Sequence, residues 1–192
     1  FKGAFDAGKK LSYHVMLANG NSTSSEIGGG KKVLCSITAR PGGGAVLEAY
    51  ADIDDRPNGK RRYTLQGFVG YQGKKSRLGV QFVHQSRRNG PSIDDTILEN
   101  LSIFGAAELS KKAWLFARVD RNFDPNPDGH KIAYIPFDPS ASSTFVLAGL
   151  DFRPIPDVHI MPNVEMVLYD SDENGLTPDT DLIPRVTWYY RF

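Results

Sequence analysis

Long segments of this sequence alternate strictly between apolar and polar residues, and this pattern limits the fold more than any other feature. In the closing segment RVTWYYRF, the apolar face consists of Val186, Trp188, Tyr190 and Phe192. A period of two indicates a β-strand with unlike faces, because successive side chains point to opposite sides of a sheet. No segment of ten or more residues keeps the 3.6-residue apolar period of a helix. The sequence therefore predicts an all-β protein.

Ten segments share the alternation. They are predicted strands at residues 11–21, 31–41, 45–56, 62–73, 76–88, 98–109, 112–123, 143–154, 157–169 and 181–192, and residues 1–7 resemble the end of one more. Each has about 10–13 residues, whereas strands of soluble proteins average about 5–6 and tilted membrane strands need about 9–11. The strand lengths favour a membrane-spanning sheet.

The connections between these segments alternate between short and long. The short ones lie at 8–10, 41–44, 73–75, 110–111 and 154–156, and the long ones at 22–30, 57–61, 89–97, 124–142 and 170–180. Outer-membrane barrels have short periplasmic turns and longer extracellular loops. The sorting predicts an antiparallel, up-and-down transmembrane β-barrel with Phe192 at the periplasmic rim.

The apolar faces need cover from water, and two architectures supply it. Lipid can surround a single closed wall, since only helices and closed barrels satisfy every backbone polar group in hydrocarbon. A soluble β-sandwich binding module, with a second sheet over the first, is the alternative. Aromatic side chains expected near the periplasmic ends favour lipid, because aromatic girdles mark membrane interfaces. They are Tyr13, Tyr71, Phe152, Trp188, Tyr190 and Phe192.

The alternating aromatic residues Trp188, Tyr190 and Phe192, which end the chain, resemble the assembly signal of outer-membrane barrels. The segments YTLQGFVGYQG, RLGVQFVHQ, KKAWLFARVDR and FVLAGLDFRP resemble bacterial porin-type proteins of the phosphate-selective-porin-like group. This resemblance covers most of the chain and rests on pattern. It implies a location in the bacterial outer membrane, insertion by the barrel-assembly machinery, and a capacity to form homo-oligomers. The implied function is a porin-like channel for passive diffusion of small polar or ionic solutes.

Porins of this type have about 16–18 strands, against about ten or eleven here. We therefore interpret residues 1–192 as one β-barrel domain that lacks its N-terminal strands. The alternative is a closed small barrel with a structural, adhesive or enzymatic role.

The polar faces of the predicted strands carry charges of both signs. The residues expected to line the pore are Glu48, Asp52, Arg77, Arg118, Asp120, Asp151, Arg153, Glu165 and Arg185. Such a wall solvates permeating solutes, and cross-strand ion pairs that stiffen the sheet are an equally good interpretation. The formal net charge of +1 argues against nucleic-acid binding. Because Cys35 is the only cysteine, the chain has no internal disulfide.

Two long loops begin with the spacing of a calcium loop, in which alternate oxygen ligands converge on the cation. The candidate ligands are Asp124, Asn126, Asp128, Asp170, Asp172 and Asn174. Asp, Asn, Gly and Pro are also ordinary loop residues, so calcium is the weaker hypothesis and no cofactor is expected.

Catalysis is not expected from the sequence. The residues Asp52, Asp54 and His84 are predicted near the extracellular end, but His84 falls on the outward phase of its strand. No set of nucleophile, base and orienting group is visible in the pattern.

Overall fold

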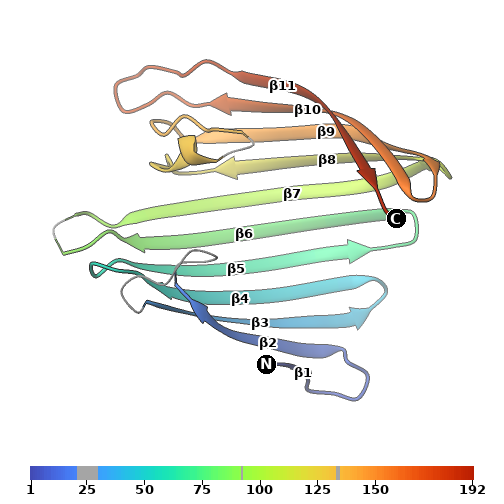
Figure 1. Cartoon of the computed structure of the whole chain (residues 1–192), viewed down its shortest axis with the longest axis horizontal. Coiled ribbons are helices and arrows are strands. Elements are labelled where there is room, and N and C mark those ends of the chain that lie inside the picture. Colours follow the sequence, from blue (N-terminus) through green and yellow to red (C-terminus); the bar gives the residue numbers. More distant parts are fainter. Residues whose placement is uncertain (21–29, 92, 133–134) are drawn as a thin grey trace. The chain divides into compact units, whose positions relative to one another are not determined.

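The computed structural model describes residues 1–20, 30–91, 93–132 and 135–192. Eleven antiparallel strands follow one another up and down in one sheet, in the order β1 to β11 (Figure 1). Their bounds are β1 Lys2–Ala4, β2 Leu11–Asn19, β3 Lys31–Gly42, β4 Ala45–Asp55, β5 Arg61–Gln72, β6 Ser76–Arg88, β7 Thr96–Ser110, β8 Ala113–Asn122, β9 Ser143–Ile155, β10 Val158–Tyr169 and β11 Asp181–Tyr190. A single turn of 3-10 helix, η1 (Gly129–Lys131), interrupts the connection between β8 and β9. No helix in the described ranges has the length and apolarity needed to cross a membrane.

The all-β prediction and the ten long strands are confirmed, and β1 is the expected eleventh strand, with Lys2 opposite His14. The predicted closure into a barrel is not formed, because the strand order begins at β1 and ends at β11 without a pairing between them. These edges are also unequal, since β1 has three residues and β11 has ten. The strands form one sheet rather than the two sheets of a sandwich.

The chain forms two compact units: unit 1 contains Phe1–Gly70 and Gln81–Glu99, and unit 2 contains Tyr71–Val80 and Asn100–Phe192. The strands within each unit pair antiparallel, and the register shifts near short turns, between Ala39 and Gly42 in unit 1 and between Glu108 and Ser110 and between Val158 and Ile160 in unit 2. In unit 1, Cys35 of β3 lies opposite Val15 and Ala51. In unit 2, Ala117 of β8 lies opposite Gly105 and Ala148.

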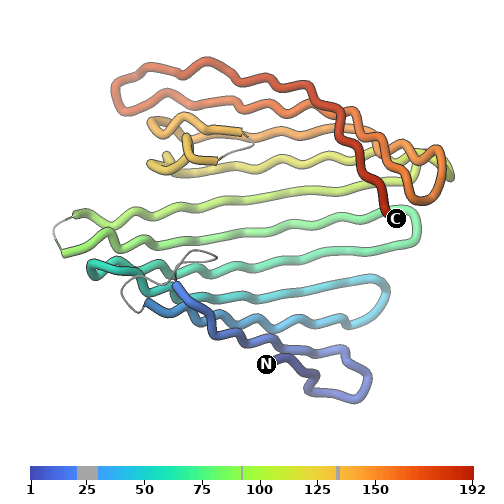
Figure 2. The backbone as a smooth tube through the Cα atoms, viewed as in Figure 1, coloured from blue at the N-terminus to red at the C-terminus, as the bar shows by residue number. Residues whose placement is uncertain are grey.

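The predicted alternation of short and long connections is also largely confirmed, as the backbone trace shows (Figure 2). Two residues join β3 to β4, β7 to β8, and β9 to β10, whereas residues 123–142 and 170–180 form the longest described loops. The predicted loop at 22–30 lies, except for Gly30, outside the described residues.

The connection predicted as long at 57–61 is a tight turn. Asn58 and Gly59 have φ values of 64° and 70°, and the Arg56 N–H donates to the Lys60 carbonyl at 2.9 Å. Asn and Gly tolerate this left-handed conformation better than other residues, so two of them in sequence close a hairpin.

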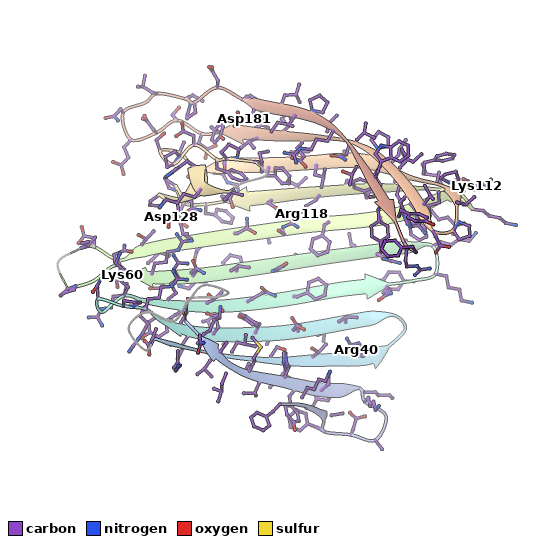
Figure 3. All side chains as sticks on the ribbon, in the orientation of Figure 1. Arg40, Lys60, Lys112, Arg118, Asp128 and Asp181 are labelled. Atoms are coloured by element: carbon purple, nitrogen blue, oxygen red, sulfur yellow. The ribbon has the colours of Figure 1, made fainter. Side chains whose placement is uncertain are left out.

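The two faces of the strands have the opposite polarity to that of a water-soluble sheet. On the apolar faces, Leu17, Leu65 and Val69 are 68%, 59% and 58% exposed. On the polar faces, Ser102 and Asp54 are only 1% and 5% exposed. Side chains project from both sides of the ribbon (Figure 3). The apolar faces therefore lack cover within the described protein, while polar groups are buried.

Gly149 of β9 lies at a close approach of three strands. A Cβ atom at this position would lie 2.5 Å from Cζ of Phe116, 2.6 Å from Cβ of Asn163 and 2.8 Å from the carbonyl oxygen of Pro162. We expect Gly149→Ala to lower the free energy of unfolding by about 1–3 kcal/mol, because the neighbours must shift to admit the methyl group.

Equilibrium denaturation checks this prediction, with Gly67→Ala as the matched control. Gly67 is also within a strand, but a Cβ there meets no atom within 4 Å. Equal effects of the two substitutions would contradict the packing argument.

Candidate functional site

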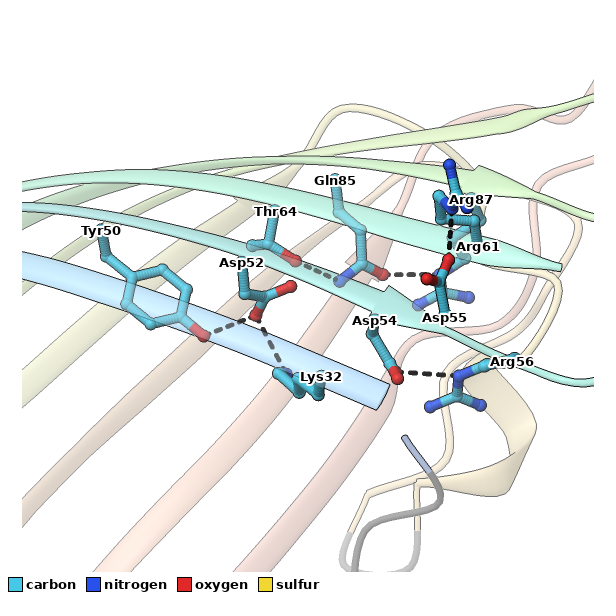
Figure 4. Close-up of polar contacts among 10 residues, drawn as sticks. All are labelled: Lys32, Tyr50, Asp52, Asp54, Asp55, Arg56, Arg61, Thr64, Gln85 and Arg87. Carbon is cyan, nitrogen blue, oxygen red and sulfur yellow. Dashed lines mark hydrogen bonds and ion pairs between the residues drawn. The ribbon is translucent and has the colours of Figure 1, made fainter. Parts of the chain in front are cut away.

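The polar face of unit 1 is built on β4, whose alternation brings Glu48, Tyr50 and Asp52 to one side. Lys32 of β3 places its Nζ 3.0 Å from Oδ2 of Asp52, and the Tyr50 hydroxyl donates to the same oxygen (Figure 4). The Thr38 hydroxyl donates to Oε2 of Glu48 at 2.9 Å. The two predicted pore-lining acids of this unit are therefore held by neighbours on β3 and β4.

The same polar face continues toward the long-loop end of the strands. Arg56 Nε lies 2.9 Å from Oδ2 of Asp54, while Oδ1 of Asp54 is buried and has no hydrogen-bond partner among the described residues. On β5 and β6, the Gln85 amide donates to Thr64 at 3.1 Å, and Arg87 Nε donates to Gln85 at 2.6 Å. A strip of polar contacts thus crosses unit 1 from β3 to β6 (Figure 4).

In unit 2, the polar face is centred on a buried carboxylate. Arg118 Nε lies 2.8 Å from both carboxylate oxygens of Asp120, and the Ser102 hydroxyl donates to the same side chain. The Asn100 amide donates to Asn122 at 2.7 Å. Asp120 and Ser102 are 9% and 1% exposed, so the carboxylate is neutralised where water has little access.

A second cluster of unit 2 lies nearer the short turns. Asp151 accepts hydrogen bonds from Arg153 at 2.6 and 2.8 Å, and Nδ1 of His159 lies 2.7 Å from its other oxygen. The Arg153 guanidinium carbon is 5.4 Å from the centre of the Trp114 ring, and that of Arg77 is 5.7 Å from it. One tryptophan thus contacts two cations, an arrangement favoured by the negative face of its ring.

The remaining predicted pair joins β10 to β11. Nη2 of Arg185 lies 3.3 Å from Oε2 of Glu165, close enough for an ion pair, although this buried oxygen accepts no hydrogen bond from the described residues. All nine predicted pore-lining residues thus lie on the polar faces of their units. Most of their charges meet a partner of opposite sign or a hydrogen-bond donor, as the ion-pair interpretation predicts.

The loop 123–142 contributes a feature that the sequence analysis missed. Ile135 and Phe137 pack on the polar side of unit 2 against Phe145 and Val167. The hydroxyl of Tyr169 fastens the same loop, since it accepts from the Asp138 N–H at 3.1 Å. The partly buried residues around this cluster are Phe137, Leu147, Tyr169 and Ile183. The signal was present, because Phe145 and Val167 are apolar at positions where the alternation calls for polar residues.

The suspected calcium loops use their oxygens for other contacts. Oδ1 of Asp172 accepts the backbone N–H groups of Asn174 and Leu176 at 2.8 Å each, and these bonds, the one from Leu176 first, lower the pKa of Asp172. The Arg121 guanidinium lowers the pKa of Asp170 in the same way, through a side-chain hydrogen bond.

In the other loop, Oδ1 of Asn126 accepts the Asp128 N–H at 3.1 Å, and Lys131 Nζ lies 2.7 Å from the Asp128 carboxylate. Within the residues that the structure describes, no group of three or more His, Cys, Asp or Glu side chains could hold a metal ion. The calcium hypothesis, which included Asp124, therefore gains no geometric support.

The residues of the predicted assembly signal lie at the end of the sheet. Trp188 and Tyr190 are on the apolar face of β11, where they are 70% and 61% exposed. The ring of Tyr190 is 6.1 Å from that of Phe192, which follows the strand. Their position on an edge strand leaves these rings accessible to another molecule.

Comparison with protein-family models, with curated proteins and with solved structures finds no match for this chain. Its function must therefore be argued from the geometry of the two faces.

We expect loss of the Asp172 carboxylate to loosen the loop that it stabilises. Because the pKa of Asp172 is lowered by folding, its contribution is present above the ordinary value of 3.8 and disappears as the pH falls through the lowered pKa. Hydrogen exchange of the Leu176 amide, followed by NMR, should be several-fold faster in Asp172→Ala than in the wild type at pH 7. In the wild type, the same loss of protection should appear only in strong acid, where Asp172 becomes protonated. Asp179→Ala, in the same loop, is the control, and equal exchange in both variants would contradict the assignment.

Proposed function

We propose that this chain forms part of the wall of a transmembrane β-barrel in the bacterial outer membrane, and that its polar faces line a channel for passive diffusion of small polar or ionic solutes. The supporting observation is the inverted polarity of the sheet, with exposed aliphatic side chains on one face and buried, paired charges on the other. Lipid is the medium in which that arrangement is stable, since the exposed side chains then contact acyl chains.

The extent of the apolar face is suited to a bilayer. On β5 the apolar face begins at Tyr63 and ends at Tyr71, with Leu65 and Val69 between them. At about 3.4 Å per residue, this distance is about 27 Å along the strand, or about 20 Å along the membrane normal for a strand tilted by about 40°. The apolar band of outer-membrane barrels is about 25 Å tall and is flanked by aromatic residues at both interfaces. Tyr63 and Tyr71 occupy the positions of those two girdles.

The paired charges on the polar faces suit a water-filled lumen. A wall that contains Lys32 with Asp52 and Arg118 with Asp120 is hydrophilic and has little net charge. Such a wall can replace part of a solute's hydration without binding it tightly, as diffusion through a channel requires.

The unpaired edges of β1 and β11 support a larger barrel. In hydrocarbon, each unsatisfied backbone group costs several kcal/mol, so both edges must pair with further strands. In this proposal, strands beyond the described sheet complete the wall. The barrel-assembly machinery reads Trp188, Tyr190 and Phe192, and the finished barrels can associate as homo-oligomers.

Conductance in planar bilayers tests the channel. We expect the inserted protein to pass an ion current, and Asp120→Asn to shift the reversal potential toward anion selectivity, because Arg118 then remains unpaired on the wall. Glu173→Gln, in an exposed loop, is the matched control and should leave the reversal potential unchanged. An inserted protein that carries no current would contradict the channel and leave only a structural role for the wall.

A pair of substitutions on adjacent residues tests which face meets lipid. Leu65→Arg should weaken insertion, because a charge on the lipid side of a barrel is unfavourable by up to about 2–4 kcal/mol, a cost that is largest at the midplane and smaller toward the interfaces. Gln66→Arg, on the opposite face, should insert normally. Insertion into vesicles, followed by protease protection, measures both, and equal behaviour would show that neither face prefers lipid.

A further inference from the structure

The apolar face of unit 1 carries a histidine–carboxylate pair that the channel does not use. On β6, His84 alternates with Gln85, whose side chain points to the polar face, so the imidazole lies on the apolar side. Its Nδ1 is 2.9 Å from Oε1 of Glu99 on β7. The two side chains are 37% and 39% exposed. An ion-pairing couple on a face of aliphatic residues calls for an explanation beyond the stability of the sheet.

A serine hydroxyl lies next to this pair. Ser86 is two residues beyond His84 and therefore projects from the same face, with its Cα about 6.8 Å away along the strand. Within the described part of the chain, the Ser86 hydroxyl and Nε2 of His84 make no hydrogen bond. Rotation about the Cα–Cβ bond of Ser86 can bring Oγ toward Nε2, and such bonds are often long until a substrate binds.

These three residues have the chemical order of a hydrolytic triad. A carboxylate that accepts a hydrogen bond from Nδ1–H fixes the tautomer in which Nε2 is a base, and a base beside a serine hydroxyl activates that hydroxyl as a nucleophile. His84 lies on the apolar face, as the outward phase of its strand predicts. Its partner Glu99 could not be recognised from the alternation, because Glu99 belongs to the next strand, thirteen residues beyond Ser86.

An apolar groove of about 440 Å³ on this face includes His84 in its lining. Its walls include Ile37, Leu65 and Phe82, and its floor is low because Ala49 and Gly67 have little or no side chain. A groove of this kind on a lipid-facing surface is shaped for a hydrocarbon chain. Because His84 is part of the lining, an acyl chain in this groove would bring its carboxyl end within reach of the imidazole.

The depth of the site also suits an ester. The hydrogen bond from Gln85 to Thr64 places this part of β6 level with Tyr63, the aromatic residue at the loop end of the apolar face of β5. Aromatic girdles lie at the level of the lipid headgroups, where the ester bonds of membrane lipids are found.

We propose that His84, Ser86 and Glu99 form a site that hydrolyses acyl esters of membrane lipids from the lipid-facing side of the sheet. This inference rests on the membrane placement proposed above, but it does not require an open channel. Ser86 and His84 are the catalytic residues, and Glu99 is a positioning residue that acts through His84.

The reaction has two balanced steps. Ser86 Oγ attacks the ester carbonyl carbon while His84 Nε2 takes the hydroxyl proton, and the tetrahedral intermediate then expels the lipid alcohol, which receives that proton from His84. The product is an acyl ester on Ser86. Water then attacks this ester with His84 again as base, which releases the fatty acid and restores the serine hydroxyl.

The other histidine–carboxylate pair of the described chain shows what this assignment requires. His159 and Asp151 lie on the polar face of unit 2, and the residue two positions beyond His159 is Met161, which has no nucleophile. A histidine and a carboxylate alone are therefore not sufficient for the assignment.

Release of fatty acid from membrane vesicles tests the proposal. The full chain is inserted into vesicles of phosphatidylethanolamine and phosphatidylglycerol, and separately into the same vesicles with added lipopolysaccharide. We expect release from at least one of the two lipid sources, and their comparison identifies whether the ester belongs to a phospholipid or to an acylated glycolipid. Ser86→Ala and His84→Asn should each lower the rate at least about 10³-fold. Ser171→Ala and His130→Asn, both in exposed loops, should match the wild type.

The role of Glu99 is tested by the pH profile of the rate, which a purely structural role would leave unchanged. Glu99→Gln should lower the rate and change its pH profile, because the imidazole loses the partner that fixes its tautomer, and Glu99→Asp should restore part of both. A long-chain alkyl fluorophosphonate should label the wild type at Ser86 and leave Ser86→Ala unlabelled, which excludes a contaminating lipase.

Three outcomes would overturn the site. They are no release or labelling by a protein that has inserted, full activity in Ser86→Ala, and a protein that does not insert at all. The first two leave the membrane wall and its conductance standing, whereas the third removes the wall as well. Protease protection of each variant distinguishes a lost active site from a failure to insert.

Discussion

Pairing of backbone hydrogen bonds along the sheet is the constraint on which the rest of this structure depends. Each of the ten long strands finds its partners in its neighbours, so the side chains are free to divide into two faces of unlike polarity. One face then holds residues such as Leu65, and the other holds carboxylates such as Asp120, each beside a cation or a donor. A sheet that folds in water has the opposite arrangement, with aliphatic side chains buried and charged side chains exposed, because exposed aliphatic area is unfavourable in water.

The sequence predicted most of the fold because strand periodicity is a local property. Alternation alone located the ten long strands, the direction in which Leu65 or Asp120 points, and most of the short and long connections. Closure of the sheet could not be predicted in this way, since it depends on whether the edges of β1 and β11 find partners. The connection predicted at 57–61 has the expected five residues, 56–60, but the turn at Asn58 and Gly59 makes it one of the short connections rather than one of the long ones.

The candidate sites were less accessible to sequence reasoning, because they depend on register between strands. The nine predicted pore-lining residues lie on the polar faces of their strands, whereas their partners, such as Lys32 for Asp52, become known only when β3 is set against β4. For the same reason, the pairing of Glu99 with His84 could not be predicted, because it depends on the register between β6 and β7. The spacing of the calcium motif likewise does not reveal that Asp172 turns its carboxylate back onto its own loop.

The packing of Ile135 and Phe137 against Phe145 and Val167 separates two kinds of loop in this protein. Asn58 and Gly59 of the tight turn are exposed, so an epitope tag inserted between them should remain accessible to an antibody. The same tag inserted between Ile135 and Phe137 would separate these side chains from Phe145 and Val167 on the polar face of unit 2. The chain thus offers one position for an accessible label and one at which an insertion disrupts buried packing.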